Sequence, residues 1–167
     1  MPIRLETERL LLREFRASDV PAYAPMLADI DVMRYMGEGK TFTADEAWRA
    51  VAGMLGHWRL LGYGMWAIEE KATGKLVGRA GFLDPPGWPG FELGWMLGKP
   101  YWGRGFATEA AARCLRYAFE ELGRERVISL IRPANQPSVR VAERIGEKLA
   151  GEVELLGAKA LMYEAKP

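Results

Sequence analysis

The sequence predicts an α+β domain with a mixed sheet, and three observations lead to this fold class. Of the 167 residues, 49% are hydrophobic and 27% are charged, a composition typical of a single globular domain. Hydrophobic periods follow one another as strand, two helices, several strands, and finally strand, helix, strand, helix and hairpin. No charge block or internal repeat interrupts this order, so one domain is expected over residues 1–167.

The N-terminal part is expected to begin with one strand and one helix. Residues 10–15 (LLLREF) alternate loosely between apolar and polar positions and predict the first strand. Ser18 offers an N-cap for a helix that extends to about Ala28, and Pro25 inside that helix predicts a kink or an early end.

The second helix has the clearest signal in the chain. Thr43-Ala-Asp-Glu46 is a capping box, which satisfies backbone N–H groups that are free at a helix start. Apolar residues recur behind it at helical spacing as far as Leu61, and Gly62 can end the helix. We therefore expect a long amphipathic helix between these two signals.

The middle of the chain changes to strand periods. Residues 64–70 and 76–83, joined through a Thr73-Gly74 turn, predict a hairpin. Residues 84–90 (DPPGWPG) predict a stiff loop, because proline cannot donate to a strand ladder. Residues 91–97 (FELGWML) follow as another strand.

The C-terminal part alternates helices and strands. An amphipathic helix is expected from about Ala107 to Gly123, where the glycine can end it. The remaining expected elements are a buried strand at residues 126–131 (RVISLI), a short helix at 138–145, and a hairpin of residues 149–156 and 158–164.

Charge and cysteine content exclude several classes of function. Lys and Arg number 23 against 22 Asp and Glu, so a net charge of +1 gives no bulk attraction to nucleic acid or to an anionic membrane. A lone Cys114 and a lone His57 argue against disulfides and against a metal centre. The charged start lacks the apolar core of a signal peptide and no charge-free run could span a membrane, so a cytoplasmic protein is expected.

A glycine pair stands between a predicted strand and a predicted helix. Gly103 and Gly105 let a ligand approach the backbone, and the free N–H groups of the helix start favour a phosphate. A dinucleotide fold is not supported, because Thr108 occupies the third glycine position and no acidic residue ends the following strand. No Gly-Lys-Ser/Thr completes a P-loop either, and a tight connection without a ligand is the alternative.

A polar cluster opens the next helix. Asn135 and Ser138 follow the buried strand at 126–131, although Asn and Ser at a helix start are also ordinary caps. This cluster and the glycine pair both follow the carboxyl ends of neighbouring parallel strands, where open sheets bind ligands. We therefore expect them to face one crevice.

Glu92 begins a strand among apolar neighbours. Burial of a carboxylate there is unfavourable and raises its pKa, so that Glu92 could accept a proton near neutral pH. An outward-facing strand position is the alternative. Cys114 and His57 are expected to serve packing, and Trp88 is expected to cover apolar surface.

Four segments occur in order over nearly the whole chain. They are Leu5-Glu-Thr-Glu-Arg-Leu-Leu-Leu-Arg13, Glu92-Leu-Gly-Trp95, Tyr101-Trp-Gly-Arg-Gly-Phe-Ala-Thr-Glu-Ala110 and Asn135-Gln-Pro-Ser-Val-Arg-Val-Ala-Glu-Arg-Ile-Gly146. Their combination resembles the GNAT superfamily and, more narrowly, its branch related to ribosomal-protein-alanine N-acetyltransferases. The combination is specific, although no single segment is.

The resemblance implies a three-layer α/β/α domain with a twisted, mixed, mostly antiparallel sheet whose fourth and fifth strands splay apart to hold acetyl-CoA. The edge of the fourth strand would pair with the pantetheine arm, and N–H groups of the glycine loop would hold the pyrophosphate. The family signature Gln/Arg-x-x-Gly-x-Gly/Ala falls on Trp102, Gly105 and Ala107, and Trp102 departs from it. The residues implied for the cofactor are Trp95, Met96, Leu97, Trp102, Gly103, Arg104, Gly105, Phe106, Ala107, Thr108, Asn135, Ser138 and Arg140.

The resemblance also implies the catalytic roles. Glu92 would accept the amine proton, directly or through water, and a backbone N–H near Met96 would polarise the thioester carbonyl. Ser138 stands where many members have a tyrosine that protonates the departing thiolate. Direct transfer in a ternary complex is expected, because a buried Cys114 offers no acyl-enzyme intermediate.

The acceptor pocket is implied to lie between residues 30–42, the turn at Leu156-Gly157 and the loop at 84–90. The side chains expected to line it are Met33, Tyr35, Met36, Phe42 and Trp88. A protein N-terminus and a small-molecule amine both remain open as acceptors, and a homodimer is compatible with the resemblance. A non-catalytic acyl-CoA sensor and a plain interaction domain are the alternative functions.

Overall fold

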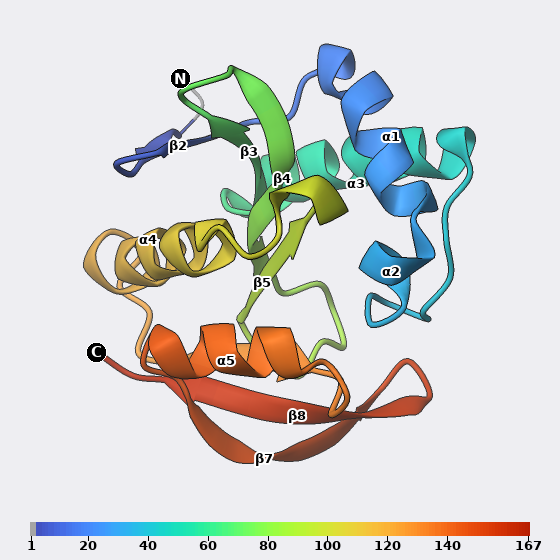
Figure 1. Cartoon of the computed structure of the whole chain (residues 1–167). Coiled ribbons are helices and arrows are strands. Elements are labelled where there is room, and N and C mark those ends of the chain that lie inside the picture. The colour runs from blue at the N-terminus through green and yellow to red at the C-terminus, as the bar shows by residue number, and fades with distance from the viewer. Residues whose placement is uncertain (1–2) are drawn as a thin grey trace.

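One open sheet of eight strands, covered by helices, forms the part of the chain that the computed structural model describes, residues 3–167 (Figure 1). The strands are β1 (Leu5–Glu6), β2 (Leu10–Arg13), β3 (Met65–Glu70), β4 (Lys75–Leu83), β5 (Glu92–Leu97), β6 (Val127–Ile131), β7 (Lys148–Leu155) and β8 (Ala158–Ala165). The helices are η1 (Ala17–Asp19), α1 (Val20–Ala28), α2 (Ile30–Met33), α3 (Ala44–Leu61), η2 (Lys99–Tyr101), α4 (Phe106–Glu120) and α5 (Gln136–Arg144), of which η1 and η2 are 3₁₀ turns.

The sheet order is β1-β2-β3-β4-β5-β6-β8-β7, and only β5 and β6 run parallel. Those two strands share a single register pair, Glu92 with Ile128, and beyond it they do not pair. This confirms a mixed, mostly antiparallel sheet that opens between the fourth and fifth predicted strands. The two-residue β1 was not predicted, and it shifts the numbering of every later strand by one.

Helices cover both faces of the sheet, which gives the three layers seen in Figure 1. Trp66 of β3 packs in the apolar cluster that contains α4, whereas the next residue, Ala67, packs in the cluster that contains α1, α2 and α3. Successive strand side chains point to opposite faces, so the two clusters lie on opposite sides of the sheet. A third, smaller cluster joins α5 to β6 and β8.

The predicted helix starts differ in how well they are confirmed. At α3, Thr43 accepts a hydrogen bond from the Glu46 N–H at 3.3 Å, and Gly62 ends the helix in the left-handed conformation with φ +76°, as predicted. At α1, the N-cap is Asp19 rather than Ser18, which lies in η1. Pro25 does not end α1 early, because the helix continues to Ala28.

Other boundaries also differ from the periodic pattern. The short α2 was not predicted; Asp29 caps it by accepting from the Asp31 N–H at 2.8 Å. Helix α4 ends at Glu120, before Gly123, since the Leu122 N–H already turns back to the Tyr117 carbonyl at 3.1 Å. Both predicted hairpins, β3–β4 and β7–β8, are confirmed.

A buried ion pair attaches η1 and α1 to the sheet. Arg13 of β2 donates two hydrogen bonds to Asp19, each of 2.8 Å, and a third of 2.7 Å to Glu69 of β3. Burial alone would raise the pKa of Asp19, but the hydrogen bonds and charge of Arg13 hold it below its ordinary value. The pair therefore fixes the start of the helical layer against two strands.

Residues 3–167 lack two features, a membrane-spanning helix and a cluster of metal ligands. No helix in this range has both the length and the apolarity needed to cross a membrane. Within the same range, His, Cys, Asp and Glu side chains form no group of three or more that could hold a metal ion. Cys114 is fully buried in α4, and burial raises the pKa of its thiol, in agreement with a packing role.

Candidate active site

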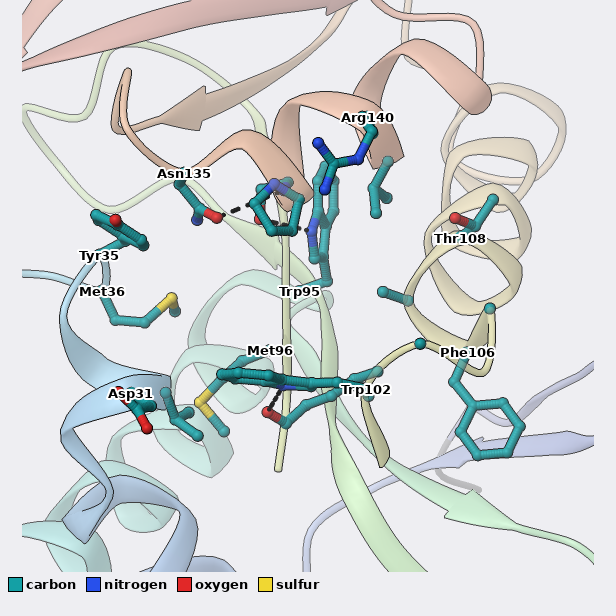
Figure 2. Close-up of a pocket in the computed structure, with 18 of the residues that line it drawn as sticks. Asp31, Tyr35, Met36, Trp95, Met96, Trp102, Phe106, Thr108, Asn135 and Arg140 are labelled. Atoms are coloured by element: carbon teal, nitrogen blue, oxygen red, sulfur yellow. Dashed lines mark hydrogen bonds between the residues drawn. The ribbon is translucent and has the colours of Figure 1, made fainter. Parts of the chain in front are cut away.

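A cavity of about 670 Å³ lies between the end of β5, the start of α4 and α5, beyond the single pair that joins β5 to β6. In Figure 2, Tyr35 and Met36 form one side of it and Thr108 of α4 forms the other, while Asn135, the N-cap of α5, and Arg140 of α5 also line it. The glycine loop and the α5 cluster therefore face one crevice, as predicted. Of the residues predicted for a cofactor, the cavity wall contains Trp95, Met96, Leu97, Trp102, Gly103, Gly105, Phe106, Ala107, Thr108, Asn135, Ser138 and Arg140.

The start of α4 is built to receive an anion. Gly103 and Gly105 have φ of +74° and +78°, values that side-chain-bearing residues rarely adopt, so the turn itself requires glycine. Gly105 is the N-cap and offers no side-chain acceptor to the first turn, in contrast to Thr43 at α3. The first backbone N–H groups of α4 are therefore available to a phosphate at this end of the cavity.

Two tryptophans line the cavity and hydrogen-bond within it, as Figure 2 shows. The Trp102 indole N–H donates to the Leu97 carbonyl at 2.9 Å, and the Trp95 indole N–H donates to Ser138 Oγ at 3.3 Å. The first bond engages the carbonyl that ends β5. Trp102, which departs from the family signature, therefore binds the end of β5. No sequence pattern indicated this role.

Asn135 fulfils the capping interpretation that the sequence left open. Its Oδ1 accepts a hydrogen bond from the Ser138 N–H at 3.4 Å, which fixes the start of α5. Asn135 and Ser138 also line the cavity, so the cap and the cavity wall are the same residues. The two interpretations are therefore compatible.

Cationic side chains gather along one wall. Arg140 lines the cavity as predicted, and Arg144, one helical turn further on α5, lines it as well. Within residues 3–167 neither arginine forms an ion pair. Arg144 was not predicted, although the i, i+4 spacing from Arg140 was a signal that could have identified it.

Three predicted site residues line neither this cavity nor the smaller one that adjoins it. Arg104 pairs with Glu70 and stacks over the Phe106 ring at 4.4 Å, which turns its charge away from the crevice. Met33 is buried in the apolar cluster under α1 to α3, and Phe42 packs against the same cluster. For Met33 and Phe42, packing of the helices is therefore the observed role.

A second cavity, of about 210 Å³, adjoins the first. Tyr35, Met36, Trp95, Asn135 and Ser138 line both, so the two cavities meet at these side chains. Of the predicted acceptor residues, Tyr35, Met36 and Trp88 line the second cavity, together with Glu92, Arg79, Arg132 and the turn at Leu155 and Leu156.

Glu92 lies in the wall of the second cavity with only 8% of its surface exposed. The outward-facing alternative is therefore wrong. Burial raises the pKa of Glu92 to about 7, while a 2.6 Å hydrogen bond from the Trp88 indole N–H and the charge of Arg79 oppose the rise. Trp88 thus holds the carboxylate.

A second buried carboxyl group, Glu147, was not predicted. Ser129 Oγ lies 2.8 Å from the Leu93 carbonyl and 3.0 Å from Glu147 Oε1. The hydroxyl has one hydrogen, and a carbonyl can only accept, so a protonated Glu147 satisfies both contacts. Burial raises the pKa of Glu147 to about 8, and the charge of Glu92 acts in the same direction. This bridge joins β5 to β6 where their ladder stops.

Known proteins are similar to this chain in sequence and in fold. A family model described as an acetyltransferase (GNAT) domain matches residues 9–148. The uncharacterized N-acetyltransferase YnaD of Bacillus subtilis (strain 168) is 32% identical over 149 residues, which cover 89% of this chain and 85% of YnaD.

Solved structures agree with that family. The crystal structure of an acetyltransferase from Agrobacterium tumefaciens str. C58 has a TM-score of 0.88 at 33% identity and covers 99% of this chain and 95% of its own. RimL, a ribosomal L7/L12 alpha-N-protein acetyltransferase solved in complex with coenzyme A, has the same fold, with a TM-score of 0.82 at 20% identity over 98% of both chains. The chain therefore belongs to the GNAT acetyltransferase family and is an acetyl-CoA-dependent acyltransferase.

Proposed function

We propose that the protein transfers the acetyl group of acetyl-CoA to a primary amine, by direct attack in a ternary complex. One observation carries the proposal: a buried carboxyl group, Glu92, lines a small pocket that joins the larger cavity at Trp95 and Ser138. A base therefore lies in the smaller of two connected spaces. We call the smaller space the acceptor pocket and the larger one the cofactor cavity.

The residues of the cofactor cavity fit acetyl-CoA. The uncapped start of α4 offers N–H groups to the pyrophosphate, and Arg140 and Arg144 offer charges without ion-pair partners in residues 3–167. The edge of β5 beyond Glu92 has no strand partner, so its backbone can pair with amides of the pantetheine arm. Bound acetyl-CoA would supply an activated thioester.

Glu92 is proposed as the general base. An amine attacks only when it has lost its proton, and a carboxylate with a pKa of about 7 can accept that proton near neutral pH. An α-amine, with an ordinary pKa of ~8, loses its proton more easily than a lysine amine at ~10.4. The acceptor is proposed to be a primary amine, of a protein N-terminus or of a small molecule.

Ser138 is proposed to assist the departing thiolate. Because the Trp95 indole N–H donates to Ser138 Oγ, the hydroxyl hydrogen of Ser138 remains free for another acceptor. The residue also stands at the junction of the two spaces, where thioester and amine would meet. A thiol with an ordinary pKa of ~8.5 leaves readily, so one hydrogen bond is a sufficient contribution.

The test is acetyl-CoA turnover on a panel of amines that includes peptides with free N-termini. Glu92→Gln keeps an acceptor for Trp88 and is expected to lower kcat/KM by about 10²- to 10⁴-fold, because it cannot take up the proton. Ser138→Ala is expected to lower kcat. Glu125→Gln, at an exposed glutamate, serves as the control and should leave turnover unchanged. Unchanged activity in both site variants would overturn the proposed roles.

A further inference from the structure

The acceptor pocket has an unequal balance of charge. Its charged lining residues are Glu92, Arg79 and Arg132, so two guanidinium groups line a space that holds one carboxyl group. Once Glu92 has taken up the proton of the amine, the pocket contains two positive charges and no negative one. An acceptor that brings an anionic group would restore the balance.

Arg79 is the group that lacks an anionic partner. It lies in the middle of β4, half-buried, with Ala67 of β3 and Met96 of β5 as its neighbours in register. Within residues 3–167 it forms no ion pair. It donates a hydrogen bond to the buried phenol of Tyr23, and its charge acts on Tyr23 and on Glu92. A half-buried guanidinium in a central strand is unfavourable unless an anion compensates it.

Arg132 has a different role, because both of its terminal nitrogens already donate hydrogen bonds. Its guanidinium donates to four carbonyl oxygens from the loop after α2 and from the β7–β8 hairpin. They are the carbonyls of Gly37 (3.0 Å), Leu155 (2.9 Å), Ala158 (2.8 Å) and Lys159 (3.2 Å). Arg132 therefore joins two walls of the pocket, and Arg79 remains as the anion-binding group.

We infer that the acceptor is a small amine with a carboxylate beside the amino group, and that Arg79 binds this carboxylate while Glu92 accepts the proton of the amine. The inference rests on the proposed function. A guanidinium matches a carboxylate with two parallel hydrogen bonds, and a pocket of about 210 Å³ suits a small molecule. A peptide N-terminus carries a neutral amide at that position, and a polyamine adds positive charge, so both match the pocket less well.

The test compares three probes of similar shape, leucine, leucinamide and 3-methylbutylamine, at saturating acetyl-CoA. Because their amines differ in basicity, each probe is compared between wild type and variant. Arg79→Gln is expected to lower kcat/KM for leucine by about 10- to 100-fold, the effect of losing a charge-assisted pair, and to change the other two by less than about threefold. Arg79→Lys, which keeps the charge, should recover part of the activity on leucine.

Two results would overturn the inference. One is an equal loss on all three probes in Arg79→Gln and Arg79→Lys, which would give Arg79 a structural role only. The other is efficient acetylation of leucinamide or a peptide by wild type with none of leucine, which would reject the carboxylate and leave the acetyltransferase proposal standing. If the acetyltransferase proposal itself were wrong, the wild-type protein would acetylate no amine at all.

A binding measurement on the wild-type protein tests the inference without any variant. Tryptophan fluorescence of CoA-loaded wild type, titrated with leucine and with leucinamide, reports binding through Trp88 and Trp95 in the pocket wall without any substitution. The inference predicts saturable binding of leucine at concentrations about tenfold lower than for leucinamide. Equal affinity for the two probes would contradict it.

Discussion

At the scale of single residues, the ionisation of Glu92 decides when the site can act. Burial raises its pKa to about 7, and only the ionised carboxylate can accept a proton. We therefore expect kcat/KM for one amine to rise with pH through about 7, in addition to any rise that follows the ionisation of the amine. A kinetic pH profile between about pH 5 and 9 measures this step.

Glu92→Gln is the matched control for that profile. The variant should lack the step near pH 7, and its remaining activity should follow only the ionisation of the amine. If Glu92→Gln kept the rise in kcat/KM near pH 7, that rise would belong to a different group, such as Glu147.

Glu147 gives a prediction about stability. Its pKa in the folded protein, about 8, lies above the ordinary value of 4.5. Between these two pH values the unfolded chain has lost the proton and the folded protein keeps it, so stability is full below about pH 4.5 and declines as pH rises to about 8. Glu147→Gln removes this decline, which totals on the order of a few kcal/mol between the two pH values, and its unfolding free energy should depend less on pH.

Urea unfolding at several pH values measures the Glu147 effect. The remaining pH dependence of the variant belongs mainly to Glu92, whose pKa is raised in the same direction. Glu125→Gln, at an exposed position, should keep the wild-type decline. If Glu147→Gln declined as steeply as wild type, Glu147 would be ionised in the folded protein at neutral pH.

Which site residues the sequence predicts depends on whether their signal is local. Glu92 is a lone acid in an apolar strand, and this local contrast is enough to identify it. Ser129 and Glu147 are separated by 18 residues and meet only in the folded sheet, so no pattern relates them. Arg104 stands between two glycines of the cofactor loop, but sequence adjacency does not set side-chain direction, and Glu70 holds it elsewhere.

At the scale of elements, the Arg13–Asp19 pair connects the helical layer to the sheet. Removing Asp19 leaves the buried Arg13 with Glu69 as its remaining carboxylate partner, so Asp19→Ala should lower the free energy of unfolding by about 3 kcal/mol, the lower end of the range for breaking a buried pair. The pKa of Asp19 is lowered, so this contribution is present above the ordinary pKa of 3.8 and is lost as pH falls through the folded value. Thermal or urea unfolding at neutral and at acid pH measures both effects.

An exposed acid provides the control for that prediction. Asp45 lies in the first turn of α3 and is exposed, so Asp45→Ala should cost no more than about 1 kcal/mol. Equal losses in the two variants at neutral pH would mean that the Arg13–Asp19 pair contributes no more than a surface charge.

Elements were predictable where their ends carry chemical signals. The capping box at Thr43 and the left-handed Gly62 defined α3, and the glycine turns defined both hairpins. The short α2 and β1 have too few residues for a hydrophobic period to be recognised, and only tertiary contacts stabilise elements of this length. Pro25 was misleading because packing of α1 outweighs the loss of one hydrogen bond.

At the scale of the whole molecule, the site is a product of the sheet topology. The parallel pairing of β5 with β6 and its early end create the cofactor cavity, and the order of predicted elements was enough to anticipate this. The acceptor pocket is different, since its walls come from the loop after α2, β4 and the β7–β8 hairpin. Arg132 joins two of these segments, and Arg79 lies on a third, so neither could be predicted from a local pattern.

Isothermal titration with acetyl-CoA and with CoA measures whether the cofactor cavity beside the end of β5 binds acetyl-CoA. Gly105→Glu places a carboxylate at the start of α4, and Gly123→Glu places one in a similar left-handed conformation beyond the other end of that helix, with φ of +78° and +62° in the native chain. We expect wild type and Gly123→Glu to bind both ligands with Kd of about micromolar, and Gly105→Glu to bind neither. No binding by wild type, or equal binding by Gly105→Glu, would contradict the account.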